Sequence, residues 1–123
     1  MIVFCDSSAH EACVVLPNDD VHLFTYPERV TTNQGEYLAL LHALDLVKDV
    51  WADHIYIRSD SQLIVNQVSG IWRCRDPKLV PLRDKARTML GTTGWTDYMT
   101  LSWTPREQNL AGIVLEGRKN VKH

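Results

Sequence analysis

The sequence lacks the features that mark exported or membrane-spanning chains. No apolar run approaches the roughly 20 residues needed to cross a bilayer. The opening run Met1–Cys5 is too short for a signal peptide, and Asp6 follows it at once. The three cysteines, Cys5, Cys13 and Cys74, are widely spaced and form no C-x-x-C pair. This pattern argues against a disulfide framework or a zinc site and favours reduced, buried thiols in a cytoplasmic protein.

Length and composition indicate one ordinary folded domain. The 123 residues are 45% hydrophobic and 23% charged, which is typical of a soluble globular protein. A chain of this length can bury a single core but is too short for two. No internal repeat or low-complexity tract interrupts it. We therefore expect a single domain over residues 1–123, acting as a monomer.

The net charge of −2 conceals two halves of opposite sign. Residues 1–57 contain two Lys or Arg and nine Asp or Glu, a net charge of −7. Residues 58–123 contain eleven and six, a net charge of +5. Most of the basic residues lie between Arg73 and Arg87, and Arg118, Lys119 and Lys122 form a basic tail. The asymmetry fits a basic surface that meets an anion, with an acidic site elsewhere, or else a solvated helix face of mixed charge.

Hydrophobic periodicity predicts an α/β fold. Three short runs rich in β-forming residues, 1–5, 12–16 and 21–26, are separated by turns and therefore form an antiparallel meander. Helical spacing follows from Glu36 to about Val50, and Asn33 with Glu36 has the form of a capping box. The remaining predicted elements are a strand over 54–58, a helix over 59–69 ended by Gly70, a helix over 77–90, a strand over 98–103, a loop over 104–108 and a helix over 109–116 ended by Gly117. The order β-β-β-α-β-α-α-β-α predicts a five-stranded mixed sheet, three antiparallel strands then parallel additions, with helices on both faces.

Three acidic residues fall where such a sheet assembles a ligand site. Asp6 closes the first strand, Glu36 lies in the first turn of the first helix, and Asp60 follows the fourth strand. Ligand sites in open α/β sheets form at strand ends and helix starts, so these carboxylates can converge. They suit Mg²⁺ or Mn²⁺, and two such ions about 4 Å apart can promote phosphodiester hydrolysis. Each acid also has a purely structural interpretation: Asp6 as a turn residue, Glu36 in the capping box and Asp60 as a helix cap.

Four segments together resemble the successive motifs of type 1 ribonuclease H. They are Cys5–Ser8, Thr32–Leu40, Ser59–Val65 and Trp103–Asn109, and they occur in the family's order across nearly the whole chain. The first is the weakest, because the family usually has Asp-Gly-Ser where this chain has Asp-Ser-Ser. The resemblance implies a ribonuclease H-like fold, two divalent ions during catalysis, and cleavage of the RNA strand of RNA–DNA hybrids that leaves 5′-phosphate and 3′-hydroxyl ends.

The resemblance also implies nucleic-acid contacts. Asn33 and Gln62 would contact the hybrid in the minor groove, where RNA displays its 2′-hydroxyls. Trp72 and the basic residues after it would grip the backbone of the DNA strand. The full set of implied substrate contacts is Ser8, Asn33, Gln62, Trp72, Arg73, Arg75 and Asn109. Glu107 lies in the loop where the family often has a mobile residue that aids product release. Structural alternatives are a cap for Asn33, a solvated helix position for Gln62, a core position for Trp72 and a plain loop acid for Glu107.

The last predicted helix departs from the family pattern. The family has a fourth acid in the pattern N-x-x-A-D, whereas here Asn109 is followed by Leu-Ala-Gly-Ile, so that the acid's position falls on Gly112 or Ile113. The only acid of that helix is Glu116. Because helical side chains lean toward the N-terminus, we expect Glu116 to reach back to the metals as a fourth catalytic ligand. The alternatives are Asn109, through its neutral carbonyl oxygen, or no fourth ligand.

The leading hypothesis is therefore a divalent-metal-dependent endoribonuclease that acts on RNA–DNA hybrids. Two alternatives stay open. One is a catalytically weakened module that binds hybrids or RNA, and the other is a different nuclease of the same superfamily, a junction resolvase or an exonuclease. Kinship of fold alone does not separate them.

Overall fold

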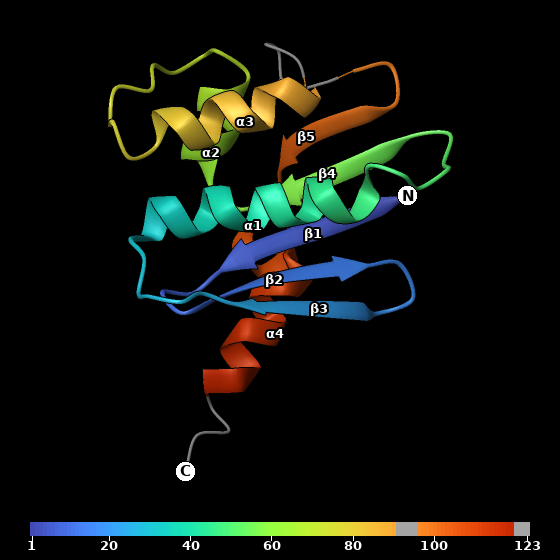
Figure 1. Ribbon diagram of the computed structural model, residues 1–123. Coiled ribbons are helices and arrows are strands. Elements are labelled where there is room, and N and C mark those ends of the chain that lie inside the picture. Colours follow the sequence, from blue (N-terminus) through green and yellow to red (C-terminus); the bar gives the residue numbers. More distant parts are fainter. Residues whose placement is uncertain (91–95, 120–123) are drawn as a thin grey trace.

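Five strands form a mixed sheet in the computed structural model, which describes residues 1–90 and 96–119 (Figure 1). Their bounds are β1 Ile2–Ser7, β2 Glu11–Leu16, β3 Asp20–Thr25, β4 Ile55–Ser59 and β5 Met99–Trp103. Their order across the sheet is β3-β2-β1-β4-β5. β1 and β3 are antiparallel to β2, whereas β4 is parallel to both β1 and β5. The predicted meander with parallel additions is confirmed.

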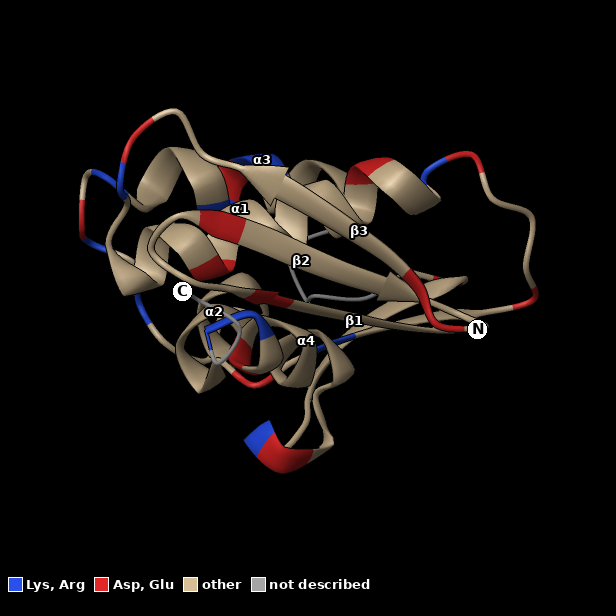
Figure 2. Cartoon of the chain, turned by 90° about the horizontal axis from the view of Figure 1, so that it is seen from below, with Lys and Arg blue, Asp and Glu red and all other residues tan. Residues whose placement is uncertain are grey.

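The helices cover both faces of the sheet. Within the described residues they are α1 Thr32–Val47, α2 Gln62–Val68, α3 Val80–Leu90, the 3₁₀ helix η1 Arg106–Gln108, and α4 Leu110–Lys119. α1 packs against β1, β2 and β4, with α2 and α3 beside it, whereas α4 packs against β1 and β2. α1 and α4 lie on opposite sides of the strands (Figure 2). The predicted order of helices and strands is confirmed, with η1 added in the predicted loop.

The two faces of β1 belong to two apolar clusters. Val3 and Cys5 lie in the larger core under α1. Phe4 packs against the smaller cluster under α4, which consists of Cys13, Val15, Ala111 and Leu115. Successive side chains of a strand point to opposite faces, so Asp6 continues the row of Phe4 on the α4 side. Asp6 therefore lies near the end of β1, close to Glu36 of α1 and to Gly112 of α4.

All three cysteines are free and buried, as the sequence predicts. No helix among the described residues combines the length and the apolar character needed to span a membrane. Lys122 of the basic tail lies outside the described residues.

Three predicted helix starts are wrong. α2 begins at Gln62 rather than at 59, because Ser61 is its N-cap. α1 begins at Thr32 because Thr31, not Asn33, is its N-cap: the Thr31 hydroxyl accepts from the Gln34 amide at 3.2 Å, and the Gln34 side chain accepts from the Thr31 amide at 3.1 Å. α3 begins at Val80 rather than at 77, because Asp76 first closes a turn whose carboxylate accepts from the Lys78 amide at 2.9 Å.

The two glycines predicted to end helices behave differently. Gly70 has a φ of 85° just after α2, the left-handed conformation that ends a helix and that a glycine adopts without strain. Gly117 stays inside α4, which continues to Lys119, so the predicted end at this glycine is wrong. A glycine ends a helix only where the backbone takes that left-handed turn.

Candidate active site

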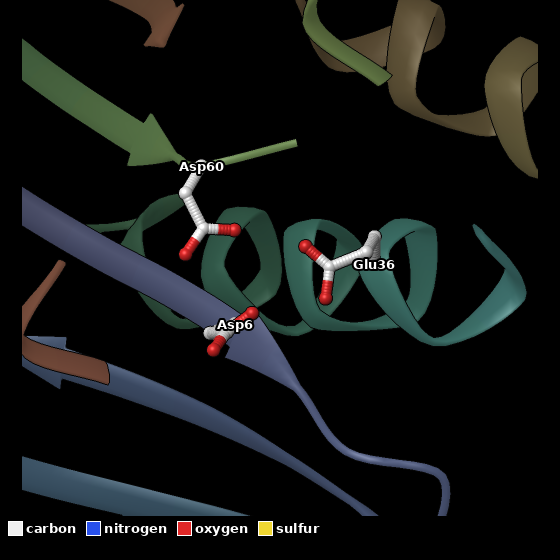
Figure 3. Close-up of side chains that lie close together, drawn as sticks. All are labelled: Asp6, Glu36 and Asp60. Carbon is white, nitrogen blue, oxygen red and sulfur yellow. The ribbon is translucent and has the colours of Figure 1, made fainter. Parts of the chain in front are cut away.

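The three carboxylates singled out in the sequence lie together (Figure 3). One ligand oxygen each from Asp6, Glu36 and Asp60 falls within 4.8 Å of the others. The parallel pairing of β1 with β4 brings Asp6 and Asp60 side by side, and α1 presents Glu36 to them. The predicted convergence is confirmed.

The structural interpretations of these acids are wrong. Asp6 lies within β1, paired with Cys13, and not in a turn. Asp60 does not cap α2, since the Ser61 hydroxyl accepts from the Ile64 amide at 3.3 Å. Glu36 does not cap α1, because Thr31 and Gln34 form the capping box. All three carboxylates are therefore free of the local roles that would hold them away from a common site.

Gly35 explains how α1 comes close enough to β1. A β-carbon on Gly35 would collide with the Ser7 hydroxyl and lie 3.3 Å from the Ser8 carbonyl oxygen. The Ser7 hydroxyl is instead held by the Tyr26 hydroxyl at 2.8 Å, and Tyr26 also donates to the Gly35 carbonyl at 3.3 Å. Sequence reasoning missed this contact, although the glycine directly before Glu36 was a usable signal for a close approach of two backbones.

Burial and mutual repulsion govern the protonation of the cluster. Burial raises the pKa of Glu36 far above its ordinary value, and the charge of Asp6, a hydrogen bond with Asp6 and the charge of Asp60 raise it further. The Ser7 amide donates to Glu36 at 3.2 Å and opposes that rise. Burial and the charge of Asp6 also raise the pKa of Asp60, while Asn109 and Arg106 lower it. A divalent cation among these oxygens would remove the repulsion, and an all-oxygen donor set fits Mg²⁺ or Mn²⁺.

Asn109 links the start of α4 to β1 and to Asp60 through hydrogen bonds of its side chain. It is fully buried, and its amide nitrogen donates to the Cys5 carbonyl at 3.0 Å and to Asp60 Oδ2 at 3.3 Å. Its side-chain oxygen accepts from the Ala111 amide at 3.1 Å, at the start of α4. The predicted substrate contact of Asn109 is therefore wrong, because the side chain is buried. The alternative in which Asn109 is the fourth metal ligand is not supported either, because its side-chain oxygen accepts from the Ala111 amide.

Asn109→Ala is expected to destabilise the fold by about 1–3 kcal/mol, because it leaves a buried backbone carbonyl without its donor. Urea unfolding without metal measures this. Asn33→Ala, at an exposed position, is the matched control and should change stability by less than about 0.5 kcal/mol. Equal stability losses in both variants would contradict the role of the buried amide.

Glu116 does not join the cluster. Its side chain is 59% exposed, and its carboxylate lies 3.7 Å from Lys119 Nζ. Since α4 continues past Gly117, Lys119 lies one turn beyond Glu116, and the described group of possible metal ligands comprises Asp6, Glu36 and Asp60 without Glu116. The prediction that Glu116 reaches back to Asp6 and Asp60 is therefore wrong. Of the two positions considered for the missing acid, Gly112 faces the site, because a β-carbon there would lie 2.9 Å from Asp6 Oδ2.

The implied nucleic-acid contacts divide into two groups. Exposed side chains occur at Asn33, Gln62, Trp72, Arg73, Arg75 and Glu107. Trp72 is 43% exposed, which rules out the core interpretation. Ser8 differs, because its hydroxyl accepts from the amides of His10 at 3.3 Å and Glu11 at 3.2 Å. The structure therefore gives Ser8 a role in the turn between β1 and β2.

Two residues near the carboxylates were not singled out in the sequence. Arg106 stands close enough for its charge to lower the pKa of Asp60. The Trp103 indole N–H donates to the Asp60 backbone carbonyl at 3.2 Å, and Trp103 as a whole is 46% exposed. Both lie in the Trp103–Asn109 segment, but only the return of β5 beside β4 shows that this segment adjoins Asp60.

Comparisons with known proteins agree with this geometry. Residues 5–115 match a protein family described as reverse transcriptase-like. Over 81 residues, 66% of this chain, the sequence is 42% identical to the ribonuclease HI of Halobacterium salinarum, but the match covers only 39% of that relative. The crystal structure of RNase H1 from the same species, strain NRC-1, has a TM-score of 0.73 at 30% identity and covers 98% of both chains.

A further structural likeness concerns the fold alone. LC11-RNase H1, crystallised in complex with an RNA/DNA hybrid, has a TM-score of 0.66 at 24% identity and covers 88% of this chain and 87% of its own. The sheet order and the two helix layers are thus those of a known architecture. The chain belongs to the reverse transcriptase-like family, and its fold is that of type 1 ribonuclease H.

Proposed function

We propose that this protein is a divalent-metal-dependent endoribonuclease that hydrolyses the RNA strand of RNA–DNA hybrids and leaves 5′-phosphate and 3′-hydroxyl ends. The observation that carries the proposal is the convergence of Asp6, Glu36 and Asp60 within 4.8 Å at the end of β1 and β4. The likeness to ribonuclease HI supports the same reaction class. Two divalent ions at this site would lower the pKa of an attacking water and stabilise the leaving oxygen.

Five residues of the chain have separate roles in the proposed reaction. Asp6, Glu36 and Asp60 would hold the metal, and Glu36 must first release the proton that burial and its neighbours favour. Asn109 orients Asp60 by donating to its Oδ2 at 3.3 Å. Arg106 places a positive charge near Asp60. That charge would stabilise a substrate phosphate bound beside the carboxylates.

The surroundings of the carboxylates favour a hybrid substrate. Asn33 lies one turn before Glu36 on α1, and Gln62 is the first residue of α2, two residues after Asp60. Both side chains are exposed, as amides that read a minor groove with 2′-hydroxyls need to be. The complex of LC11-RNase H1 with an RNA/DNA hybrid is a precedent within this fold.

The test is a side-by-side assay of RNA–DNA hybrid, duplex RNA, duplex DNA and a DNA junction, each labelled at one end, with and without Mg²⁺. We expect Mg²⁺-dependent cleavage of the hybrid alone, within its RNA strand and with 5′-phosphate ends. Cleavage of the junction would identify a resolvase. Tight binding of the hybrid without turnover would identify a binding module.

Hybrid binding is expected to weaken with salt through the exposed basic residues after Trp72. The logarithm of the association constant falls linearly with the logarithm of the salt concentration. Replacing both Arg73 and Arg75 by alanine should reduce the steepness of that line by roughly 0.9 for each lost phosphate contact, about 2 in total. Fluorescence anisotropy in Ca²⁺ between low and moderate salt measures the slope. Lys48→Ala is the control, because Lys48 lies just after α1 and pairs with Asp45. An unchanged slope in the double variant would move the binding surface elsewhere.

A further inference from the structure

The segment Trp72–Arg75, between α2 and α3, combines an exposed surface with a backbone that is held from inside the molecule. Its backbone is irregular, and three of its four side chains are exposed. It is nevertheless fixed at two successive residues. The Trp72 amide donates to the Asn66 carbonyl at 3.0 Å, and the Arg73 carbonyl accepts from the Gln67 side-chain nitrogen at 3.2 Å. Both partners belong to α2.

The Gln67 side chain is itself fixed by α1. Its oxygen accepts from the Tyr37 hydroxyl at 2.7 Å. Tyr37 is fully buried and Gln67 is 6% exposed, so water does not compete for these atoms and the hydrogen bonds gain strength from the apolar surroundings. Burial raises the pKa of the Tyr37 hydroxyl above its ordinary value, so the hydroxyl keeps the proton that it donates. We call the two successive hydrogen bonds, from Tyr37 through Gln67 to Arg73, the Tyr37–Gln67 relay.

The C-terminal end of α2 is held from a second side. Arg87 of α3 donates to the Val68 carbonyl at 3.0 Å and to the Gln67 carbonyl at 3.2 Å. Gly70, with its φ of 85°, then turns the chain into the segment Trp72–Arg75. α1, α2 and α3 pack against one another here (Figure 1). Gln67 is thus the point at which three helices fix the start of the exposed segment.

The relay begins beside the carboxylate cluster. Tyr37 directly follows Glu36 in α1. Successive residues of a helix point about 100° apart, so one turn of α1 directs Glu36 to Asp6 and Asp60 and Tyr37 to α2. A rigid helix and two buried hydrogen bonds therefore connect the cluster to the backbone of Arg73. The distance between the carboxylates and the exposed segment is set by these contacts.

Resting on the proposed function, we propose that Tyr37 and Gln67 are positioning residues for substrate binding. They hold the segment Trp72–Arg75 so that its indole and guanidinium groups meet the hybrid at a fixed distance from the carboxylates. Both side chains are buried, so they act through the segment and not by touching the hybrid. Loosening the relay weakens the binding of the hybrid and leaves the chemical step unchanged, because the carboxylates keep their own contacts.

Tyr37→Phe and Gln67→Met test the relay. The first removes only the hydroxyl, and the second removes both polar atoms of a side chain of similar length. We expect Kd for the hybrid in Ca²⁺ and KM in Mg²⁺ to rise about threefold to tenfold, with kcat within about twofold of the wild type. The double variant should bind no more weakly than Gln67→Met, because the two residues act in series. Tyr98→Phe, at a tyrosine that is 57% exposed, is the matched control and should keep wild-type values.

Limited trypsin digestion without substrate separates positioning from general stability. Both variants should be cut after Arg73 at least about fivefold faster than the wild type, because cleavage there requires the segment to open. Cutting after Lys48, an exposed residue just after α1, is the internal reference and should keep its wild-type rate. Urea unfolding verifies that each variant is folded under the conditions of digestion.

The outcomes separate the inference from the proposed function. Wild-type Kd and KM in both variants, or a lower kcat at unchanged KM, would overturn the inference. Faster cutting after Lys48 and Arg73 alike would also overturn it, because the relay would then only stabilise the fold. Tyr37→Phe decides the matter if Gln67→Met does not fold.

The wild type itself tests the proposed function. A wild type that binds the hybrid without cleaving it would remove the proposed endonuclease, and the Kd and trypsin comparisons would still decide the inference. A wild type that binds no hybrid would overturn both.

Discussion

Asp60→Asn is expected to abolish Mg²⁺-dependent cleavage of an RNA–DNA hybrid while the chain stays folded. Loss of a residue that only orients a ligand typically costs 10–100-fold in affinity or activity, so loss of a ligand charge should cost more than about 100-fold. The fold should tolerate the change, because Asp60 repels Asp6 and its pKa is raised by burial and by that repulsion. An asparagine of the same shape removes the repulsion.

The measurement pairs single-turnover cleavage with urea unfolding. Asp53→Asn, an exposed acid before β4, is the matched control and should keep wild-type rates. Asp60→Asn should be at least as stable as the wild type without metal and should gain less stability from added Mg²⁺. Wild-type cleavage by Asp60→Asn would refute the metal site at this position. The urea unfolding curve shows whether a variant that has lost activity is still folded.

The free energy of unfolding of the metal-free protein is expected to fall as the pH rises above about 4.3, which is the ordinary pKa of a glutamate side chain. The pKa of Glu36 in the fold lies well above that of the unfolded chain. Between the two values the folded protein keeps a proton that the unfolded chain has released, so each pH unit lowers the free energy of unfolding by up to about 1.4 kcal/mol. Mg²⁺ should reverse the loss by binding the ionised cluster in the folded state.

Glu36→Gln isolates this contribution. The glutamine keeps an oxygen for the Ser7 amide but cannot ionise, so the variant should be more stable than the wild type at pH 8 without metal and less responsive to Mg²⁺. Urea unfolding at half-unit pH steps gives the slopes. Glu28→Gln, at an exposed position, should follow the wild-type curve. A wild-type slope in Glu36→Gln would show that Glu36 does not hold the extra proton.

The sequence by itself determined the architecture and the principal acids. Period-two and helical spacing are local properties of the chain, and they sufficed for the order of strands and helices and for the direction of the sheet pairing. Strand ends and helix starts are likewise local, so Asp6, Glu36 and Asp60 could converge at one end of the sheet. The resemblance of the flanking segments to type 1 ribonuclease H then favoured the site over the structural alternatives. The buried state of the three cysteines also followed from their spacing.

Tertiary structure decided which side chains remain available to the site. Thr31 and Ser61 take the capping roles and free Glu36 and Asp60, a choice between neighbouring hydroxyl, amide and acid groups that local pattern leaves open. Asn109 turns its amide to Cys5 and Asp60, partners 104 and 49 residues away in the chain.

α4 shows most clearly where local reasoning ends. Helical periodicity put Glu116 on the same face as Gly112, but a helix carries its residues past the sheet at 1.5 Å each. Only the residue opposite Asp6 can reach the cluster, and that residue is Gly112. The identity of that residue depends on how β1 and α4 pack against each other, and the contacts that set this packing join the two ends of the chain.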